Sequence, residues 1–207
     1  MFKTEQEQFW FGNFGDEYIN RNNNNVQFVS SNIHLFSKIM SKTKNVNTLI
    51  EFGANIGLNI RALKILKPNL EISAIEINTK AAKKLGEIIN GGYILNESIL
   101  DYNPKRIYDF VLIKGVLIHI NPSELENVYE KLYESSSKYI CIVEYYSPSP
   151  SVVEYRGYKD KLFKRDFAGE MMDLYKDLEL VDYGFVYHRD INYPQDDVTW
   201  FLLKKSE

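Results

Sequence analysis

The segment Glu51-Phe52-Gly53-Ala54-Asn55-Ile56-Gly57 decides the fold, because it joins a short apolar run to a helical one. Residues 46–52 are predicted to form a strand, and residues 58–66 carry apolar side chains at helical spacing. Between them, Gly53 and Gly57 allow a tight turn and the close approach of a ligand to the backbone. The start of the following helix offers unpaired N–H groups to a carboxylate. We therefore expect a ligand at the carboxyl end of this strand.

The rest of the chain alternates strands with helices around this segment. Strands are predicted at residues 46–52, 71–77, 93–95, 109–113, 139–145, 180–188 and 198–203. Helices are predicted at residues 29–40, 58–66, 79–89 and 166–176, with a further one opening near residue 123. This alternation implies βαβ units with right-handed crossovers. No helical pattern separates the last two strands, so they should pair antiparallel at one edge. The predicted fold is α/β and Rossmann-like, with a seven-stranded, mainly parallel sheet and an antiparallel edge hairpin.

Two regions extend this core within what we predict to be a single domain, residues 1–207. The N-terminal region, residues 1–45, combines an aromatic-rich leader with the first helix, and its large aromatic side chains should pack on the core at 46–207. An insertion is predicted at about residues 146–165.

Composition excludes several classes of function. A net charge of −3 and the absence of a basic cluster argue against a nucleic-acid partner. Cys141 is the single cysteine, so neither an intrachain disulfide nor a multi-cysteine metal site is possible, and no other cluster has metal-ligand spacing. No apolar stretch is long enough to span a membrane, and the N-terminus lacks a signal-peptide core. We expect a cytoplasmic protein with no membrane insertion.

Candidate ligand-binding residues follow the ends of four predicted strands, where ligands bind in sheets of this type. Glu76 ends the second strand and can accept hydrogen bonds from both hydroxyls of a ribose, while its neighbour Ile77 can lie against an adenine. Residues 96–101 offer polar groups beside an apolar one, which suits the edge of that base, and Gly115 permits close backbone approach. The candidate cofactor residues at these ends are Glu51, Gly53, Asn55, Gly57, Glu76, Ile77, Ser98, Ile99, Lys114 and Gly115.

The glycine spacing excludes two other nucleotide sites. A dinucleotide fingerprint needs glycines in the pattern G-x-G-x-x-G, whereas the three slots here hold Gly53, Asn55 and Leu58. No Gly-Lys-Ser/Thr follows, so a phosphate-binding Walker loop is absent as well. The pattern favours an adenosine-bearing ligand without a pyrophosphate.

The combination of Glu-x-Gly-x-Asn-x-Gly, the distal Glu76 and the block 109–119 resembles the successive motifs of class I S-adenosylmethionine (SAM)-dependent methyltransferases. The sequence is most similar to small methylases associated with pseudaminic acid biosynthesis. That similarity also covers the leader at residues 9–22, the phrase at 114–122 and Glu144-Tyr145-Tyr146. Asn55 departs from the middle glycine of many methyltransferases, but asparagine also tolerates unusual backbone angles.

This resemblance implies SAM as the cofactor and a leader that forms an N-terminal cap over it. Tyr18 and Arg21 would then lie near the methionine moiety, with Arg21 available as a bidentate donor to the carboxylate. The alternative is that Tyr18 serves only in packing and that Arg21 is a surface charge.

Methyl transfer to a hydroxyl or ammonium group requires a proton to be lost, and His119 is the first candidate for the base, because neutral imidazole is available near pH 7. A structural or substrate-orienting role for His119 is the rival interpretation. Glu144 and Tyr145 close the fifth strand, where they could bind the acceptor or act in catalysis. The insertion is expected to cover the acceptor, with Tyr155, Arg156 and Tyr158 as candidate contacts.

The expected partner is a small polar acceptor, and the resemblance points to a sugar or nucleotide-sugar intermediate of surface glycan (nonulosonate) biosynthesis. Two alternatives stay open at this point. One is methyl transfer to another small metabolite, such as an amine or a carboxylate. The other is a SAM-binding protein without catalysis. The sequence sets neither the acceptor atom nor the oligomeric state.

Overall fold

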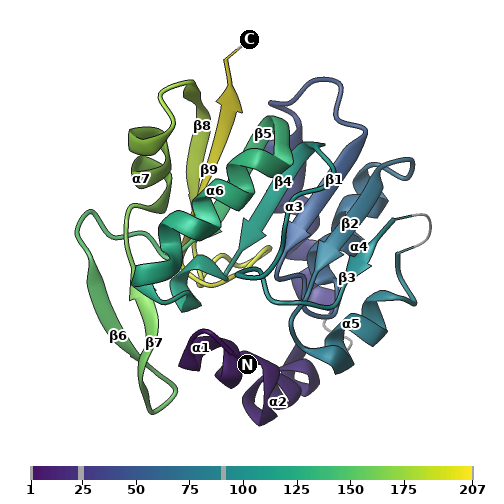
Figure 1. Cartoon of the computed structure of the whole chain (residues 1–207). Coiled ribbons are helices and arrows are strands. Elements are labelled where there is room, and N and C mark those ends of the chain that lie inside the picture. The colour runs from purple at the N-terminus through teal and green to yellow at the C-terminus, as the bar shows by residue number, and fades with distance from the viewer. Residues whose placement is uncertain (1, 23–25, 90–91, 207) are drawn as a thin grey trace.

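A computed structural model describes residues 2–22, 26–89 and 92–206. Its centre is a seven-stranded sheet with the strand order β3-β2-β1-β4-β5-β9-β8 (Figure 1). The strands are β1 (Thr48–Phe52), β2 (Glu71–Ile75), β3 (Ile94–Leu95), β4 (Tyr108–Lys114), β5 (Ser136–Glu144), β8 (Leu178–Val186) and β9 (Val198–Lys205). The first five are parallel, and β9 pairs antiparallel with both β5 and β8. The predicted fold class is confirmed, including the antiparallel pairing of the last two strands.

Helices cover both faces of the sheet, which explains why its central strands are apolar without alternation. On one face, α3 (Val26–Met40), α4 (Leu58–Leu66) and α5 (Thr79–Leu85) pack against side chains such as Leu49 and Leu112. On the other face, α6 (Leu125–Ser135) and α7 (Phe167–Leu174) pack against neighbours such as Ile50 and Ile113 (Figure 1). Consecutive strand residues thus enter two separate hydrophobic clusters.

Two further units lie at the carboxyl ends of the parallel strands. The cap consists of α1 (Glu5–Phe11) and α2 (Asn13–Asn22), and the predicted insertion forms a hairpin of β6 (Ser151–Tyr155) and β7 (Tyr158–Lys164). Figure 1 shows the cap below the ends of the central strands and beside this hairpin. Most of the leader is therefore helical, with a break at Gly12 between the two helices. A capping box starts it, because Thr4 accepts from the Glu7 amide and the Glu7 carboxylate accepts from the Thr4 amide.

Short 3₁₀ turns, η1 (Leu117–His119) and η2 (Pro122–Glu124), connect β4 to α6. Among the described residues, every helix is too short or too polar to cross a lipid bilayer.

Candidate functional site

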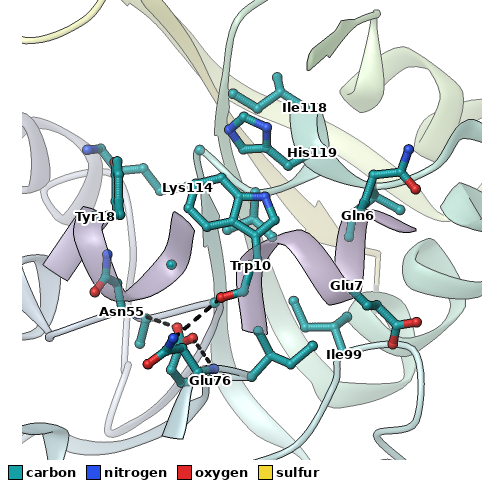
Figure 2. A pocket seen from close by; sticks show the side chains of 18 of the residues that line it. Gln6, Glu7, Trp10, Tyr18, Asn55, Glu76, Ile99, Lys114, Ile118 and His119 are labelled. Atoms are coloured by element: carbon teal, nitrogen blue, oxygen red, sulfur yellow. Dashed lines mark hydrogen bonds between the residues drawn. The ribbon is translucent and has the colours of Figure 1, made fainter. Parts of the chain in front are cut away.

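A cavity of about 220 Å³ lies between the cap and the carboxyl ends of the strands. Its floor is formed by the loops that follow β1, β2, β3 and β4, and its roof by α1, α2, β6 and the connection between β8 and β9. Figure 2 shows side chains from both parts converging on this space. The cavity is thus at the edge of the sheet that the sequence predicted.

The loop after β1 takes its shape from three residues with left-handed backbone angles: Gly53 (φ 74°), Asn55 (φ 48°) and Gly57 (φ 77°). A Cβ atom on Gly53 would lie 2.6 Å from Val116 Cγ2, and one on Gly57 would lie 2.9 Å from Leu85 Cδ2. These two glycines are therefore required by the turn and by protein packing, and Gly57 does not line the cavity. Gly53 lines the cavity, so its role in close ligand approach stays a prediction, whereas the same prediction for Gly57 is corrected.

Gly115 differs from these two glycines. It also has a left-handed backbone angle (φ 66°), but a Cβ atom there would meet nothing within 4 Å. Gly115 lines the cavity beside Lys114, so the open space next to its backbone is part of the site.

Glu76 is held in the cavity floor by two backbone amides. The Asn55 N–H donates to Oε2 at 2.6 Å, and the Asn78 N–H donates to Oε1 at 2.7 Å (Figure 2). Burial raises the pKa of Glu76, and these two amides oppose that rise. Ile77, Ser98 and Ile99 line the cavity next to it. The structure brings together the four residues that the sequence assigned to a nucleoside.

Glu51 and Glu144 lie behind the cavity wall rather than on it. Asn59 Nδ2 donates to Glu51 at 2.6 Å, and the amides of Val116 and Leu117 each donate to Glu144 at 2.9 Å. Burial raises the pKa of Glu51 to about 8 and that of Glu144 to about 7. Glu144 therefore supports the loop after β4, and Glu51 joins the end of β1 to α4.

Lys114 lines the cavity between these two acids, with its ammonium 4.7 Å from the ring centroid of Phe28. Burial lowers the pKa of Lys114 to about 8, while Glu51, Asp196 and Glu144 oppose that change. Its charge is available to an anionic group of a ligand.

His119 is buried in the loop after β4 and lies above the indole of Trp10 (Figure 2), with a distance of 4.7 Å between ring centroids. Its Nδ1 is 2.6 Å from the carbonyl oxygen of Lys161. A carbonyl can only accept, so Nδ1 carries the proton and Nε2 keeps its lone pair. Burial lowers the pKa of His119 to about 4, so the ring is neutral near pH 7.

Tyr18 and Tyr145 also line the cavity, as predicted, but Arg21 does not. Burial and the nearby Asp196 raise the pKa of the Tyr145 hydroxyl. Arg21 is exposed, and its guanidinium lies 4.8 Å from the ring of Phe14 and 5.3 Å from that of Tyr18. The predicted contact between Arg21 and a cofactor carboxylate is therefore not preformed.

Within the insertion, Tyr155 lines the cavity, whereas Arg156 and Tyr158 do not. The Tyr158 ring instead packs on Phe9 at 5.0 Å and on Phe14 at 5.7 Å between centroids. It therefore joins the hairpin to the cap.

Several lining residues were not selected from the sequence. The main ones are Gln6, Glu7, Trp10, Asn121, Gln195 and Asp196. The aromatic run around Trp10 signalled that the leader packs on something, and Asn121 belongs to the phrase at 114–122 that carries the resemblance. No pattern signalled the other four. Gln195 and Asp196 come from the connection between β8 and β9, which reads as an ordinary polar loop.

The cavity thus has two chemically different ends. Figure 2 shows Glu76 near the apolar Ile99 at one end, and His119 with Trp10 and the amide of Gln6 toward the other. Within the described ranges, no three His, Cys, Asp or Glu side chains gather closely enough to hold a metal ion.

No protein-family model matches the sequence, and neither does any curated protein. Solved structures do match the fold over nearly the whole chain. The plantazolicin methyltransferase BpumL in complex with S-adenosylhomocysteine (SAH) is 15% identical with a TM-score of 0.68, covering 98% of this chain and 94% of that one. The 1,6-didemethyltoxoflavin-N1-methyltransferase of Burkholderia thailandensis is 10% identical with a TM-score of 0.69, covering 98% and 88%.

A third match is the magnesium protoporphyrin IX methyltransferase ChlM from Synechocystis PCC 6803 with bound SAM. It is 11% identical with a TM-score of 0.64, and the match covers 97% of this chain and 95% of that one. The chain therefore has the fold shared by these methyltransferases.

Proposed function

We propose that this protein is a SAM-dependent methyltransferase acting on a small polar acceptor. The observation that carries the proposal is Glu76, whose carboxylate is held by two backbone amides at one end of the cavity, beside Ile77 and Ile99. Glu76 would accept from the ribose hydroxyls, and the two isoleucines with Ser98 would hold the adenine. Tyr18, Asn55, Lys114 and Gly115 would surround the methionine moiety.

Bound SAM supplies a methyl group on a sulfonium, and the chain aligns the acceptor with it. Such alignment contributes up to roughly 7–11 kcal/mol to catalysis. His119 would take the acceptor's proton at Nε2 when the methyl group is transferred. The Lys161 carbonyl accepts from Nδ1–H and so stabilises the charge that the ring gains. A base whose pKa lies near the operating pH adds about 10²–10⁴ in rate. Because burial lowers the pKa of His119 to about 4, we expect its contribution to lie toward the lower end of that range.

We propose an unphosphorylated sugar as the acceptor. Trp10, Tyr155 and Tyr145 offer flat faces for the apolar side of a pyranose ring, and Gln6, Asn121 and Gln195 offer amides to its hydroxyls. Among the described lining residues there is one lysine and no arginine. A nucleotide-sugar is less well supported, since its diphosphate would require more cationic donors. The resemblance to pseudaminic acid methylases supports a sugar of surface glycan biosynthesis.

Calorimetric titration with SAH and with NAD tests the cofactor. We expect SAH to bind and NAD to give no heat. Glu76→Gln should weaken SAH binding about 10- to 100-fold, because a charge-assisted hydrogen bond is lost at a buried site. The exposed Glu87→Gln is the matched control and should bind as the wild type does. Equal affinity in both variants would remove Glu76 from the cofactor site.

Transfer of the labelled methyl group from SAM to a panel of compounds tests the acceptor. The panel should contain neutral sugars, sugar acids, nucleotide-sugars and small amines. Labelling of a free sugar supports the proposal, whereas labelling confined to amines or to nucleotide-sugars contradicts the acceptor class.

A further inference from the structure

His119 is held between three parts of the chain that lie far apart in the sequence. It belongs to η1 after β4, and its ring lies 4.7 Å from that of Trp10 of the cap (Figure 2). The same ring lies 4.8 Å from that of Tyr155 of the hairpin, and its Nδ1 reaches the Lys161 carbonyl of β7. The orientation of this ring therefore depends on how the cap and the hairpin are joined.

Lys161 lies in a bulge of the hairpin. Val153 pairs with Leu162 and Tyr155 pairs with Tyr158, so three residues of β7, 159–161, face one residue of β6. Asp160 within the bulge has a left-handed backbone angle (φ 55°). Bulges turn backbone groups out of the ladder and often do so next to active sites.

Two backbone carbonyls of this bulge, those of Asp160 and Lys161, accept hydrogen bonds from neighbouring parts of the site. The Asp160 carbonyl accepts from Gln6 Nε2 of the cap at 2.9 Å, and the Lys161 carbonyl accepts from His119 at 2.6 Å. One turn of backbone thus contacts both the cap and the imidazole.

The Lys161 side chain strengthens the same junction. The residue is 8% exposed, its ammonium donates to Glu5 of α1 at 2.8 Å, and the Phe9 ring lies 5.9 Å away. Burying a lysine is costly unless its charge is paired. The ammonium therefore fixes the position of the Lys161 backbone relative to the cap.

We propose that Lys161 is the positioning residue for His119, and that it acts by fixing the Nδ1–H tautomer when the cap is in place. This rests on the proposed function, in which Nε2 receives the acceptor's proton. The Lys161 carbonyl accepts from Nδ1–H and so selects the tautomer in which Nε2 is unprotonated. The Lys161 ammonium, through its bond to Glu5, holds that carbonyl in a fixed position relative to the cap.

Long-range ¹H–¹⁵N spectra of the histidine rings at fixed neutral pH test the proposal without an acceptor. The chain has three histidines, and the spectrum of His119→Gln identifies the signals of His119 by their loss. In the wild type we expect a protonated Nδ1 and an unprotonated Nε2. Lys161→Met keeps the carbonyl but removes the bond that anchors it to Glu5 of the cap. The ratio of the Nδ1–H to the Nε2–H form should therefore fall, by up to about fivefold, the value expected if the displaced carbonyl loses its hydrogen bond to His119.

Three further variants separate positioning from general destabilisation. Lys161→Arg keeps the charge and should restore the wild-type ratio to within about twofold. Glu5→Gln should move the ratio in the same direction as Lys161→Met but less, since Glu5 is largely exposed and exposed ion pairs are weak. Lys159→Met changes an exposed lysine of the same strand and should leave the signals unchanged.

A wild-type ring protonated at Nε2 would overturn the proposal, as would an unchanged His119 spectrum in both Lys161→Met and Glu5→Gln. Titration with SAH is independent of this readout. If the wild type does not bind SAH, the proposed function is refuted. If the variants bind SAH and keep the tautomer of the wild type, only the role of Lys161 is refuted.

Discussion

The floor and the roof of the cavity are built by different interactions. In the floor, Glu76 and Glu144 at the ends of β2 and β5 accept from backbone amides at 2.6–2.9 Å. In the roof, ring contacts and side-chain hydrogen bonds join the cap to the hairpin, and the bond from Gln6 to Asp160 spans 154 residues. The floor is therefore fixed by the sheet, whereas the roof depends on the docking of two separate units.

This difference between floor and roof agrees with our proposal that the floor binds the cofactor and the roof covers the acceptor. A cofactor presents the same nucleoside in every reaction, so a floor anchored through the backbone suits it. An acceptor has to enter and leave, and side-chain contacts between two small units can separate at less cost than strands of a buried sheet. Three substitutions, in order of decreasing expected effect, test this comparison.

Gly53→Ala should be the most damaging of these changes, because its Cβ would overlap Val116 in a left-handed backbone. We expect the free energy of unfolding to fall by about 2–4 kcal/mol, measured by urea denaturation. SAH binding should weaken as well, because the same loop presents the Asn55 amide to Glu76.

Gly157→Ala in the hairpin turn is the matched control. Gly157 also has a left-handed angle (φ 85°), but nothing lies within 4 Å of its would-be Cβ. It should cost only the backbone strain, about 1–2 kcal/mol, and leave SAH affinity unchanged. If Gly53→Ala and Gly157→Ala lose the same stability and the same SAH affinity, the floor and the roof do not differ in the way described.

Glu144→Gln should change how stability depends on pH. Burial raises the pKa of Glu144 to about 7 in the folded chain, whereas the ordinary value is 4.5. Between pH 4.5 and 7 the folded state holds this proton and the unfolded state has released it, so the contribution of Glu144 to stability is lost as pH rises through that window.

Unfolding free energies at pH 4.5 and pH 7.5 check this expectation. The wild type should lose about 1–3 kcal/mol more than Glu144→Gln over this interval. The amide oxygen of glutamine can still accept from Val116 and Leu117, so the fold should be retained. Parallel curves for the two proteins would mean that Glu144 titrates normally and is not the buried support described above.

Arg21→Ala should have the smallest effect. Because Arg21 is exposed, does not line the cavity and contacts the rings of Phe14 and Tyr18, we expect SAH affinity to fall less than about threefold, in line with a weak exposed cation–π contact. A loss of tenfold or more in calorimetry would instead support the prediction from the resemblance that Arg21 binds the cofactor carboxylate. It would also show that the roof rearranges on binding.

Much of the floor could be predicted from the sequence because its residues sit next to the strand ends that periodicity reveals. Glu76, Ile77, Ser98 and Gly115 were found in this way, and all four line the cavity. Glu144 was placed at the correct strand end, but the sequence could not show that its carboxylate is bound by the loop after β4. The direction of a side chain at a strand end depends on neighbouring loops, which local patterns do not report.

The roof was only partly predictable. The aromatic leader indicated packing, yet nothing local joined Gln6 to the hairpin or placed Gln195 and Asp196 in the cavity. These positions are polar residues in short helices or loops, and their patterns are those of any solvated segment.

The sequence by itself determined the α/β fold, the antiparallel edge and the loop between β1 and α4, because hydrophobic periodicity and glycine spacing act over a few neighbouring residues. Only the tertiary structure decided which strand-end carboxylates face the cavity and how the cap meets the hairpin. It also decided which nitrogen of His119 is free. Those features arise from contacts between residues that belong to different elements, 21 residues apart for Asn55 and Glu76 and 42 residues apart for His119 and Lys161, and each depends on the packing of the whole chain.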